Sequence, residues 1–439
     1  MNYETLEQNI DNMIVVLDTN ILLYLYKCSS STSDDLLRLL NKIKENIIVP
    51  AQVINEYNKH KSSEQAKVSK KYDNFEKELT QKINSLENKL KERISEAKKY
   101  NFPKCNDLEE KISNQIGLLK TEVHKYSLEI AAEKEELIKN SQITEIDSFV
   151  SYLVVNNKIR KELDFRKHLE FIKEEELRYK YCIPPGYEDG KNKAGVDKYG
   201  DLFVWKEILE IGKENRDKYI VFITNDCKED WWILKGENKQ CDRMRDELRK
   251  EFIDETQNDR IEFITLNKFF DLFSRYHQVQ SRKTDIELNA LNYINNTITK
   301  KYYNQLMSEV SYYLFNLNYT DFDDEFYRGV PEPNYEDPTI GEFNVYFEKG
   351  DAVYNIKYES EAEVDLGYED NENDYFRLGD VSMTVVVTAE IRRKITSDDV
   401  YELNIVDVDH KEITVVNPYD LYYDPSDMED ESGEYGEYY

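Results

Sequence analysis

Short apolar runs alternate with helical spacings through the first two thirds of the chain. Strands that are buried on both faces of a sheet typically read as such runs. They occur here at 13–17, 46–49, 219–224 and 261–264. Helical spacing, with apolar residues every three or four positions, occurs at 21–24, 36–40, 201–211, 243–252 and 266–273. The alternation predicts an α/β fold with a mostly parallel sheet flanked by helices.

A long helical insertion interrupts this pattern. Apolar positions recur at steps of three and four from Val68 to Ala97, and again from Leu108 to Ile130. The segment 101–103 separates the two stripes, because its proline cannot continue a helix interior. Two helices with a short turn predict an antiparallel hairpin within an insertion at about 60–180. A coiled-coil dimer, and hence a homo-oligomer, is the alternative that the same stripe allows.

The period of the pattern changes in the last third of the chain. We expect 1–280 to form the α/β domain and 281–330 to be a helical connector. From about Glu342 the apolar residues alternate, which predicts an antiparallel β domain over 331–423. The segment 424–439 is acidic and poor in aliphatic residues, so we expect a disordered tail.

Charge is distributed very unevenly. The chain has 59 basic and 89 acidic residues, a net charge of −30. The segment 301–439 holds 9 of the basic and 35 of the acidic residues, a net charge of −26, so the rest is nearly balanced. This argues against a protein that coats nucleic acid through overall basic charge. The acidic β domain could recruit a protein partner, or compete with phosphate for basic residues and so restrain a nuclease.

Several classes of protein receive no support from the sequence. A membrane-spanning helix would need about 18 consecutive apolar residues, and no such run exists, so we expect no membrane partner. Neither a signal peptide nor a glycine-rich nucleotide-binding loop is recognisable. The five histidines are scattered, which disfavours zinc. The five cysteines form no CxxC pair, and we interpret them as reduced thiols of a cytoplasmic protein.

Four carboxylates stand at the ends of predicted elements. Asp18 and Asp226 each follow a predicted strand, and ligands of open α/β sheets bind beside such strand ends. Glu56 lies on the helix after the second strand, and Asp201 begins the helix before the 219–224 strand. An oxygen-rich site of this kind suits Mg²⁺ or Mn²⁺, which could activate water and stabilise charge on a phosphate. Each acid could instead be structural, as a helix cap, a turn residue or a solvated side chain.

Basic and aromatic residues precede Asp201 in the chain. Arg178 and Lys198 flank a segment that also contains Lys191 and Lys193, and tyrosines lie between them. Such a segment could hold a phosphate backbone and stack bases. A solvated loop is the alternative.

Four of these segments resemble the motifs of a PIN nuclease domain, in the same order. They read VVLDTNILL (15–23), VPAQVINEY (49–57), GDLFVW (200–205) and FITND (222–226). Three further runs resemble a bacterial PIN-like group with a long helical insertion: PPGY (184–187), KYGD (198–201) and KEDWW (228–232). The resemblance covers about 10–275 and leaves the predicted β domain unexplained.

The resemblance implies a metal-dependent nuclease, most often one that acts on RNA. Asp18 would be the central metal ligand, Glu56 and Asp201 would complete the shell, and Asp226 would bind a second metal or orient water. Asp230 is the alternative fourth acid. Asn20 and Asn225 would support the ligands by hydrogen bonds.

We therefore expect an endoribonuclease that uses Mg²⁺ or Mn²⁺ to cleave RNA, acting in bacterial stress or phage defence, a setting that the resemblance alone implies. One alternative is a DNA nickase or flap-type nuclease on the same site. Another is a catalytically inactive scaffold that binds partner proteins.

Overall fold

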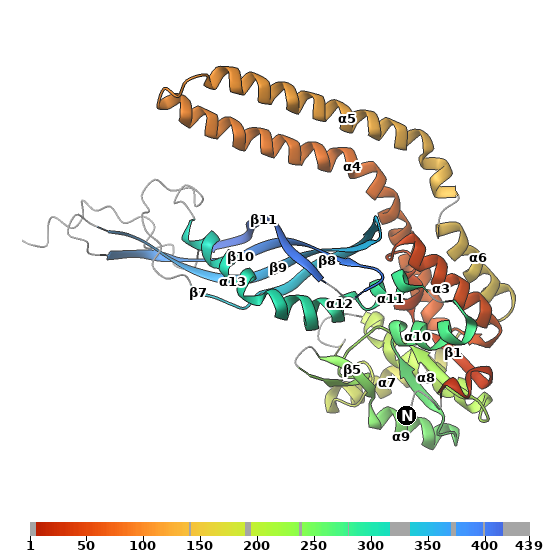
Figure 1. Ribbon diagram of the computed structural model, residues 1–439. Helices are drawn as coiled ribbons and strands as arrows, with labels where there is room; N and C mark the ends of the chain where they lie inside the picture. Colours follow the sequence, from red (N-terminus) through yellow and green to blue (C-terminus); the bar gives the residue numbers. More distant parts are fainter. Residues whose placement is uncertain are drawn as a thin grey trace, which may run out of the picture. The chain divides into compact units, whose positions relative to one another are not determined.

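The computed structural model describes residues 6–139, 142–188, 195–236, 239–279, 281–316, 334–369, 375–397 and 400–415 (Figure 1). The chain divides into two compact units, Met1–Thr284 and Asp285–Tyr439. In the part that the structure describes, no helix is both long and apolar enough to cross a membrane. The predicted Lys191 and Lys193 and the predicted tail 424–439 lie outside the described residues.

The first unit contains a four-stranded parallel sheet in the order β2-β1-β3-β6. Its strands are β1 (Met13–Leu17), β2 (Ile47–Ile48), β3 (Tyr219–Ile223) and β6 (Ile261–Ile264). Every residue of β1 and β6 is buried, which is why these strands read as nearly continuous apolar runs. In the register of β1 and β3, Leu17 lies opposite Ile223, so both strands end at the same edge of the sheet.

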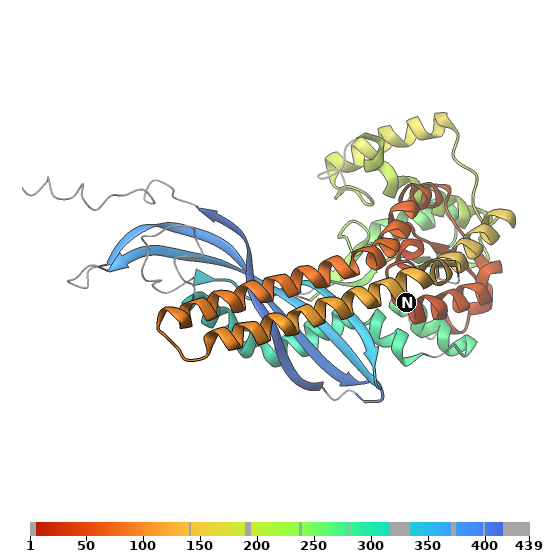
Figure 2. The same cartoon turned by 90° about the horizontal axis from the view of Figure 1, so that it is seen from above.

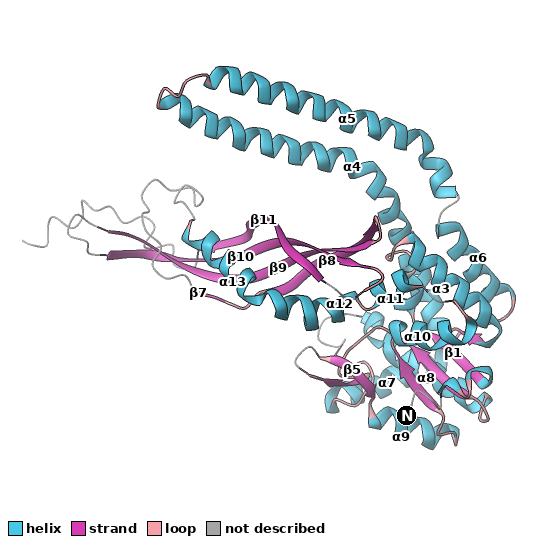
Figure 3. Ribbon diagram, viewed as in Figure 1, coloured by secondary structure: helices cyan, strands magenta, loops and turns pink. Residues whose placement is uncertain are grey.

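Helices flank this sheet, as the sequence predicts (Figure 3). They are α2 (Thr19–Tyr24), α3 (Ser30–Ile43), α8 (Gly200–Glu214), α9 (Asp246–Thr256) and α10 (Leu266–His277). Short 3₁₀ turns precede β1, β2 and α8, at Ile10–Asn12, Lys44–Asn46 and Gly195–Tyr199. Helix α8 packs on α9, and Trp205 of α8 meets Phe263 of β6 with ring centroids 6.2 Å apart. The apolar face of each helix is therefore buried against the sheet or a neighbouring helix.

The insertion forms an antiparallel helical hairpin within one chain, which confirms the first of the two alternatives (Figure 2). Helix α4 spans Ala51–Lys99 and α5 spans Cys105–Lys139. Polar contacts join the two helices: Lys120 Nζ lies 2.6 Å from Glu87 Oε2, and His124 Nδ1 lies 2.7 Å from Glu76 Oε1. Two further helices, α6 (Gln142–Val155) and α7 (Phe165–Tyr181), come before α8 in the chain.

A small antiparallel hairpin, β4 (Trp232–Lys235) and β5 (Gln240–Met244), follows β3 and corrects two predictions. The helix predicted over 243–252 begins only at Asp246, because the preceding residues pair with β4. Cys227 and Cys241, predicted to be reduced thiols, form a disulfide with their Cα atoms 5.8 Å apart. The hairpin folds back on the loop after β3, which brings together two cysteines that lie 14 residues apart.

The second unit is a long antiparallel sheet with helices packed on it (Figure 3). Its strands are β7 (Asn334–Tyr335), β8 (Thr339–Glu348), β9 (Asp351–Glu369), β10 (Tyr375–Lys394) and β11 (Val400–Val415). The order is β11-β10-β9-β7, and β8 also pairs with β9. The predicted antiparallel β domain is thus present.

Helix α11 (Arg282–Leu288) spans the boundary between the two units, and the second unit also contains α12 (Ala290–Tyr293), the π-helical turn η5 (Ile294–Ile298) and α13 (Thr299–Phe315). Ile298 of η5 and Leu306 of α13 share a core with Tyr354 and Val385 of the sheet. The segment that we expect to be a connector therefore contributes helices to this second core.

Candidate functional site

The Asp18 side chain is held by donors from both of the adjacent strand ends. Its Oδ1 accepts a hydrogen bond from Thr19 N (2.6 Å), so Asp18 also caps α2. Its Oδ2 accepts from Asn20 Nδ2 (2.5 Å) and from Thr224 Oγ1 (2.6 Å). Thr224 follows β3, so the parallel pairing of β1 with β3 creates this contact between residues 206 positions apart.

Glu56 lies on the second turn of α4 and faces the same edge of the sheet. Thr19 Oγ1 donates to its Oε2 (3.0 Å), and Gln52 Nε2 donates to its Oε1 (2.8 Å). Gly200, at the start of α8, lies directly against this carboxylate, since a Cβ at Gly200 would come within 2.6 Å of Glu56 Oε1. Glu56 is therefore the neighbour of both Asp18 and the α8 terminus that carries Asp201.

Asp201 and Asp226 share one ammonium group. Lys228 Nζ lies 2.8 Å from Asp226 Oδ2 and 3.8 Å from Asp201 Oδ2. Asp226 N in turn donates to Thr224 Oγ1 (3.0 Å), the hydroxyl that holds Asp18. Thr19, Thr224 and Lys228 thus connect acidic residues of this edge, and Gly200 places Asp201 next to Glu56 in the chain fold. We call Asp18, Glu56, Asp201 and Asp226 the acidic site.

Burial, and to a lesser degree the neighbouring carboxylates, disfavour the charged form of Asp18. Burial raises the pKa of Asp18 to about 6, against the hydrogen bonds from Thr224 and Thr19, which lower it. The negative charges of Asp226 and Glu56 raise this pKa further. A concentration of carboxylate oxygens that repel each other is the donor chemistry that a hard divalent cation requires, so the residues fit Mg²⁺ or Mn²⁺.

The side chains of the acidic site do not form a closed metal cage in this structure. Within the described ranges, no group of three or more His, Cys, Asp or Glu side chains is positioned to hold a metal ion. Mg²⁺ usually keeps several waters and takes only one or two protein carboxylates, so such a cage is not a requirement.

Asp230, the alternative fourth acid, is directed elsewhere. It is fully buried, and its Oδ2 accepts hydrogen bonds from Gly186 N (3.0 Å) and Glu188 N (3.1 Å). Burial raises its pKa, against these two hydrogen bonds and Lys228. Asp230 thus holds the loop 183–188, whereas Asp226 shares Lys228 with Asp201.

The two predicted supporting asparagines make different contacts. Asn20 Nδ2 bonds to Asp18 and to Thr224 Oγ1 (3.0 Å), and Asn20 Oδ1 accepts from Asn225 N (3.1 Å). Asn225 Oδ1 accepts from Leu266 N (2.9 Å), which ties the loop after β3 to the start of α10. Asn20 therefore touches a site carboxylate directly, and Asn225 orients Asn20.

The predicted basic residues differ in their accessibility. Arg178 is 7% exposed and forms ion pairs with Glu174 (2.6 Å) and Glu251 (2.5 Å), so its guanidinium is not presented to a substrate. Lys198 is partly exposed, and its Nζ lies 4.6 Å from the ring centroid of Tyr199, two residues before Asp201. Of the two, only Lys198 is placed where it could meet a phosphate beside the acidic site.

Sequence reasoning missed several residues that position the site. Thr19, Thr224 and Gln52 orient the carboxylates, and Lys228 neutralises two of them. Glu207 of α8, which is 2% exposed, accepts hydrogen bonds from Ala51 N (2.6 Å) and Gln52 N (3.0 Å) and so caps α4. Thr19 and Thr224 lie inside the motifs VVLDTNILL (15–23) and FITND (222–226). A hydroxyl residue directly after an apolar strand was the signal in the sequence that could have identified them.

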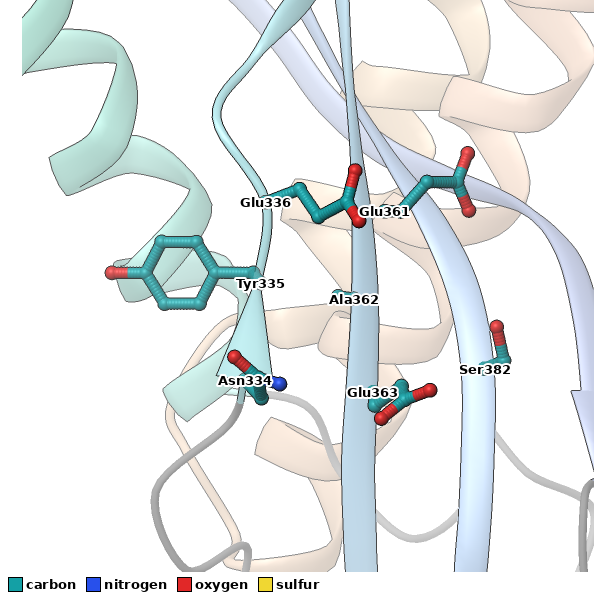
Figure 4. Close-up of a pocket in the computed structure, with 7 residues that line it drawn as sticks. All are labelled: Asn334, Tyr335, Glu336, Glu361, Ala362, Glu363 and Ser382. Carbon is teal, nitrogen blue, oxygen red and sulfur yellow. The ribbon is translucent and has the colours of Figure 1, made fainter.

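A separate cavity of about 160 Å³ lies in the second unit (Figure 4). Its lining consists of Asn334, Tyr335, Glu336, Glu361, Ala362, Glu363 and Ser382. None of these residues belongs to the acidic site, and Glu361 is engaged by the hydroxyl of Thr384 (3.1 Å). The carboxylates around it are a local part of the strong negative charge of the C-terminal third.

A family model described as a PIN-like domain matches residues 14–248, more than half of the 439-residue chain and the whole acidic site. Neither a curated protein nor a solved structure matches the chain. PIN-like domains are in general nucleases that hydrolyse nucleic acid with the help of divalent metals. The matched segment includes β1 from its second residue, the whole of β3, and all four residues of the acidic site. This chain belongs to the PIN-like domain family.

Proposed function

We propose that the protein is a metal-dependent endoribonuclease that cleaves RNA phosphodiester bonds at the acidic site. The observation that supports this proposal is that Thr19, Thr224, Lys228 and Gly200 bring the four acidic residues together beside the edge where β1 and β3 end. RNA is the substrate that the sequence resemblance implies, and DNA is treated as an outcome of the test.

Each acid has a role that follows from its contacts. A divalent cation held by Asp18, Glu56 and Asp201 would lower the pKa of a water molecule and stabilise charge on the scissile phosphate. Asp18 is oriented by three donors, so its oxygens need little reorganisation to serve as the central ligand. Asp226 is connected to Asp18 through Thr224 and could orient the attacking water or support a second cation.

Two lysines beside Asp201, Lys198 and Lys228, would contact the substrate. Lys198 can contact a phosphate of the backbone, since it is partly exposed and its ammonium lies over the rings of Tyr179 and Tyr199. The Lys228 ammonium would have to leave its position between Asp201 and Asp226 when a cation binds there. It would then be close enough to contact the same phosphate.

The test is a cleavage assay of the full chain. End-labelled single-stranded RNA, duplex RNA and DNA are incubated with Mg²⁺, with Mn²⁺ and with EDTA. We expect internal cleavage of RNA that requires a divalent metal. Cleavage of DNA alone would support the nickase, and no cleavage of any substrate with either metal would favour the scaffold.

Asp18→Asn provides the control for the site. We expect cleavage to fall at least 10³-fold, since removal of a principal charge-stabilising group typically costs 10²–10³ or more in rate. Asn can still cap α2, so the unfolding free energy should change by less than about 1 kcal/mol. Retained cleavage by a correctly folded Asp18→Asn protein would place the activity elsewhere.

A further inference from the structure

Glu175 is a buried carboxylate that the proposed mechanism does not use. It lies on α7, and its side chain is completely buried. In the part of the chain that the structure describes, neither of its carboxylate oxygens accepts a hydrogen bond. A buried ionised carboxylate in this state is unfavourable unless a proton or a cation compensates its charge.

Gly186 of the loop 183–188 lies against both Glu175 and Asp201. A Cβ at Gly186 would lie 2.4 Å from Glu175 Oε1 and 3.5 Å from Asp201 Cβ, so the three residues are immediate neighbours. Gly186 has φ = 96°, a conformation that favours glycine and lets its backbone approach this closely. Asp230 and Arg178 hold the loop, the latter through the Pro184 carbonyl.

The positive charge near Glu175 is largely engaged elsewhere. The guanidinium of Arg178 bonds to Glu174, Glu251 and Pro184 O, and reaches Glu175 only through space. Burial raises the pKa of Glu175 to about 8; Arg178 lowers this pKa and Asp201 raises it. The Tyr179 hydroxyl also lowers this pKa, although neither carboxylate oxygen meets the distance and angle criteria of a hydrogen bond among the described residues.

We propose that Glu175 is a fifth carboxylate of the acidic site, which binds a small divalent cation together with Asp201 beneath the loop 183–188. The inference rests on the proposed function. Two carboxylates and several waters are a usual coordination for Mg²⁺. The position of Glu175 also offers a reason for the glycine of the PPGY run (184–187), because Gly186 lets the loop backbone approach the Glu175 carboxylate closely.

The test measures cation binding directly. The full-length protein is titrated with Mn²⁺ by calorimetry, and free Mn²⁺ is measured by electron paramagnetic resonance. Glu175→Gln keeps the shape of the side chain and removes its charge. Glu176→Gln is the matched control, because Glu176 is the adjacent glutamate on the same helix and is exposed. Glu175→Asp keeps the negative charge on a side chain that is one methylene group shorter.

We expect Glu175→Gln to remove one bound Mn²⁺ or to weaken its affinity at least tenfold, with Glu175→Asp intermediate and Glu176→Gln within twofold of wild type. Thermal unfolding in EDTA should show Glu175→Gln at least as stable as wild type, because a buried charge has been removed.

Two outcomes overturn the inference, and they differ. If wild type binds Mn²⁺ and Glu175→Gln binds it equally well, Glu175 holds only a proton and the proposed nuclease site stands without it. If wild type binds no Mn²⁺ or Mg²⁺ at all, the metal requirement of the proposed function fails as well.

Discussion

At the scale of single residues, the Lys228 ammonium lies where Asp201 and Asp226 would share a cation. Its ammonium lies 2.8 Å from Asp226 Oδ2 and 3.8 Å from Asp201 Oδ2. A cation that binds between these acids must displace the ammonium, and a positive charge nearby also opposes a second one. Lys228 therefore stabilises the metal-free site and competes with its metal.

Lys228→Met should bind Mn²⁺ more tightly than wild type, on the order of tenfold, which corresponds to roughly 1.4 kcal/mol. Cleavage should nevertheless slow, because the ammonium is no longer available to the phosphate. Titration calorimetry and the cleavage assay measure the two effects. Lys239→Met, an exposed lysine of the β4–β5 turn that pairs with Glu229, should change neither. Weaker Mn²⁺ binding by Lys228→Met would contradict the competition.

At the scale of secondary-structure elements, two glycines of α8, Gly200 and Gly212, have very different neighbours. A Cβ at Gly200 would meet the end of the flexible Glu56 side chain, at 2.6 Å from Oε1. A Cβ at Gly212 would meet the ring of Phe252 at 2.6 Å and Thr256 at 2.9 Å, both buried on α9. A side chain at Gly200 would therefore disturb the acidic site, whereas one at Gly212 would disturb the packing of α8 on α9.

Gly200→Ala should change the free energy of unfolding by less than about 1 kcal/mol, yet reduce cleavage, since Glu56 must move away from its position. Gly212→Ala should lower stability by about 1–3 kcal/mol because α8 and α9 must separate. Its cleavage rate per folded molecule should stay near wild type. Urea unfolding and single-turnover cleavage separate the two effects, and an active Gly200→Ala would argue against Glu56 as a ligand.

The carboxylate of Glu207 joins the helix that bears Asp201 to the helix that bears Glu56. It is 2% exposed and accepts hydrogen bonds from Ala51 N and Gln52 N. Glu207→Ala should cost about 1–3 kcal/mol in unfolding free energy, because two N–H groups at the start of α4 lose their acceptor. Glu210→Ala is the control: its ion pair with Lys213 is solvent-accessible and should contribute less than about 1 kcal/mol. Equal losses in urea unfolding would show that the cap is not important.

At the scale of the whole molecule, the chain combines two units with separate cores and very different charge. The second unit begins at Asp285, and 301–439 carries a net charge of −26. An acidic surface competes with phosphate for the same cations and repels nucleic acid. This effect falls with ionic strength, because the Debye length shrinks to about 8 Å at 0.15 M salt.

A chain that ends at Thr284 should therefore cleave RNA several-fold faster than the full chain at low salt, and the difference should shrink as salt is raised. Circular dichroism and thermal unfolding establish that the shortened chain folds. If a folded truncation cleaves at the same rate as the full chain at every salt concentration, the acidic unit does not restrain the site and serves another role.

Much of the architecture is predictable from the sequence by itself. Strands β1, β3 and β6 are buried on both faces, so their apolar runs identify them without any tertiary information. The stripes of α4 and α5 predict a hairpin because proline separates them. Asp18 and Asp226 could be placed at one edge, because the carboxyl ends of neighbouring parallel strands meet there.

Only the tertiary structure decided which charged side chains face each other. Asp226 and Asp230 lie four residues apart, but Asp230 turns inward because two N–H groups of the loop 183–188 lie there. Glu175 and Glu207 carry no local signal in a chain with 34% charged residues. The partners of Glu207, Ala51 N and Gln52 N, are 156 and 155 residues away in the sequence. Periodicity reports how a residue meets solvent, whereas its partners depend on how distant elements pack.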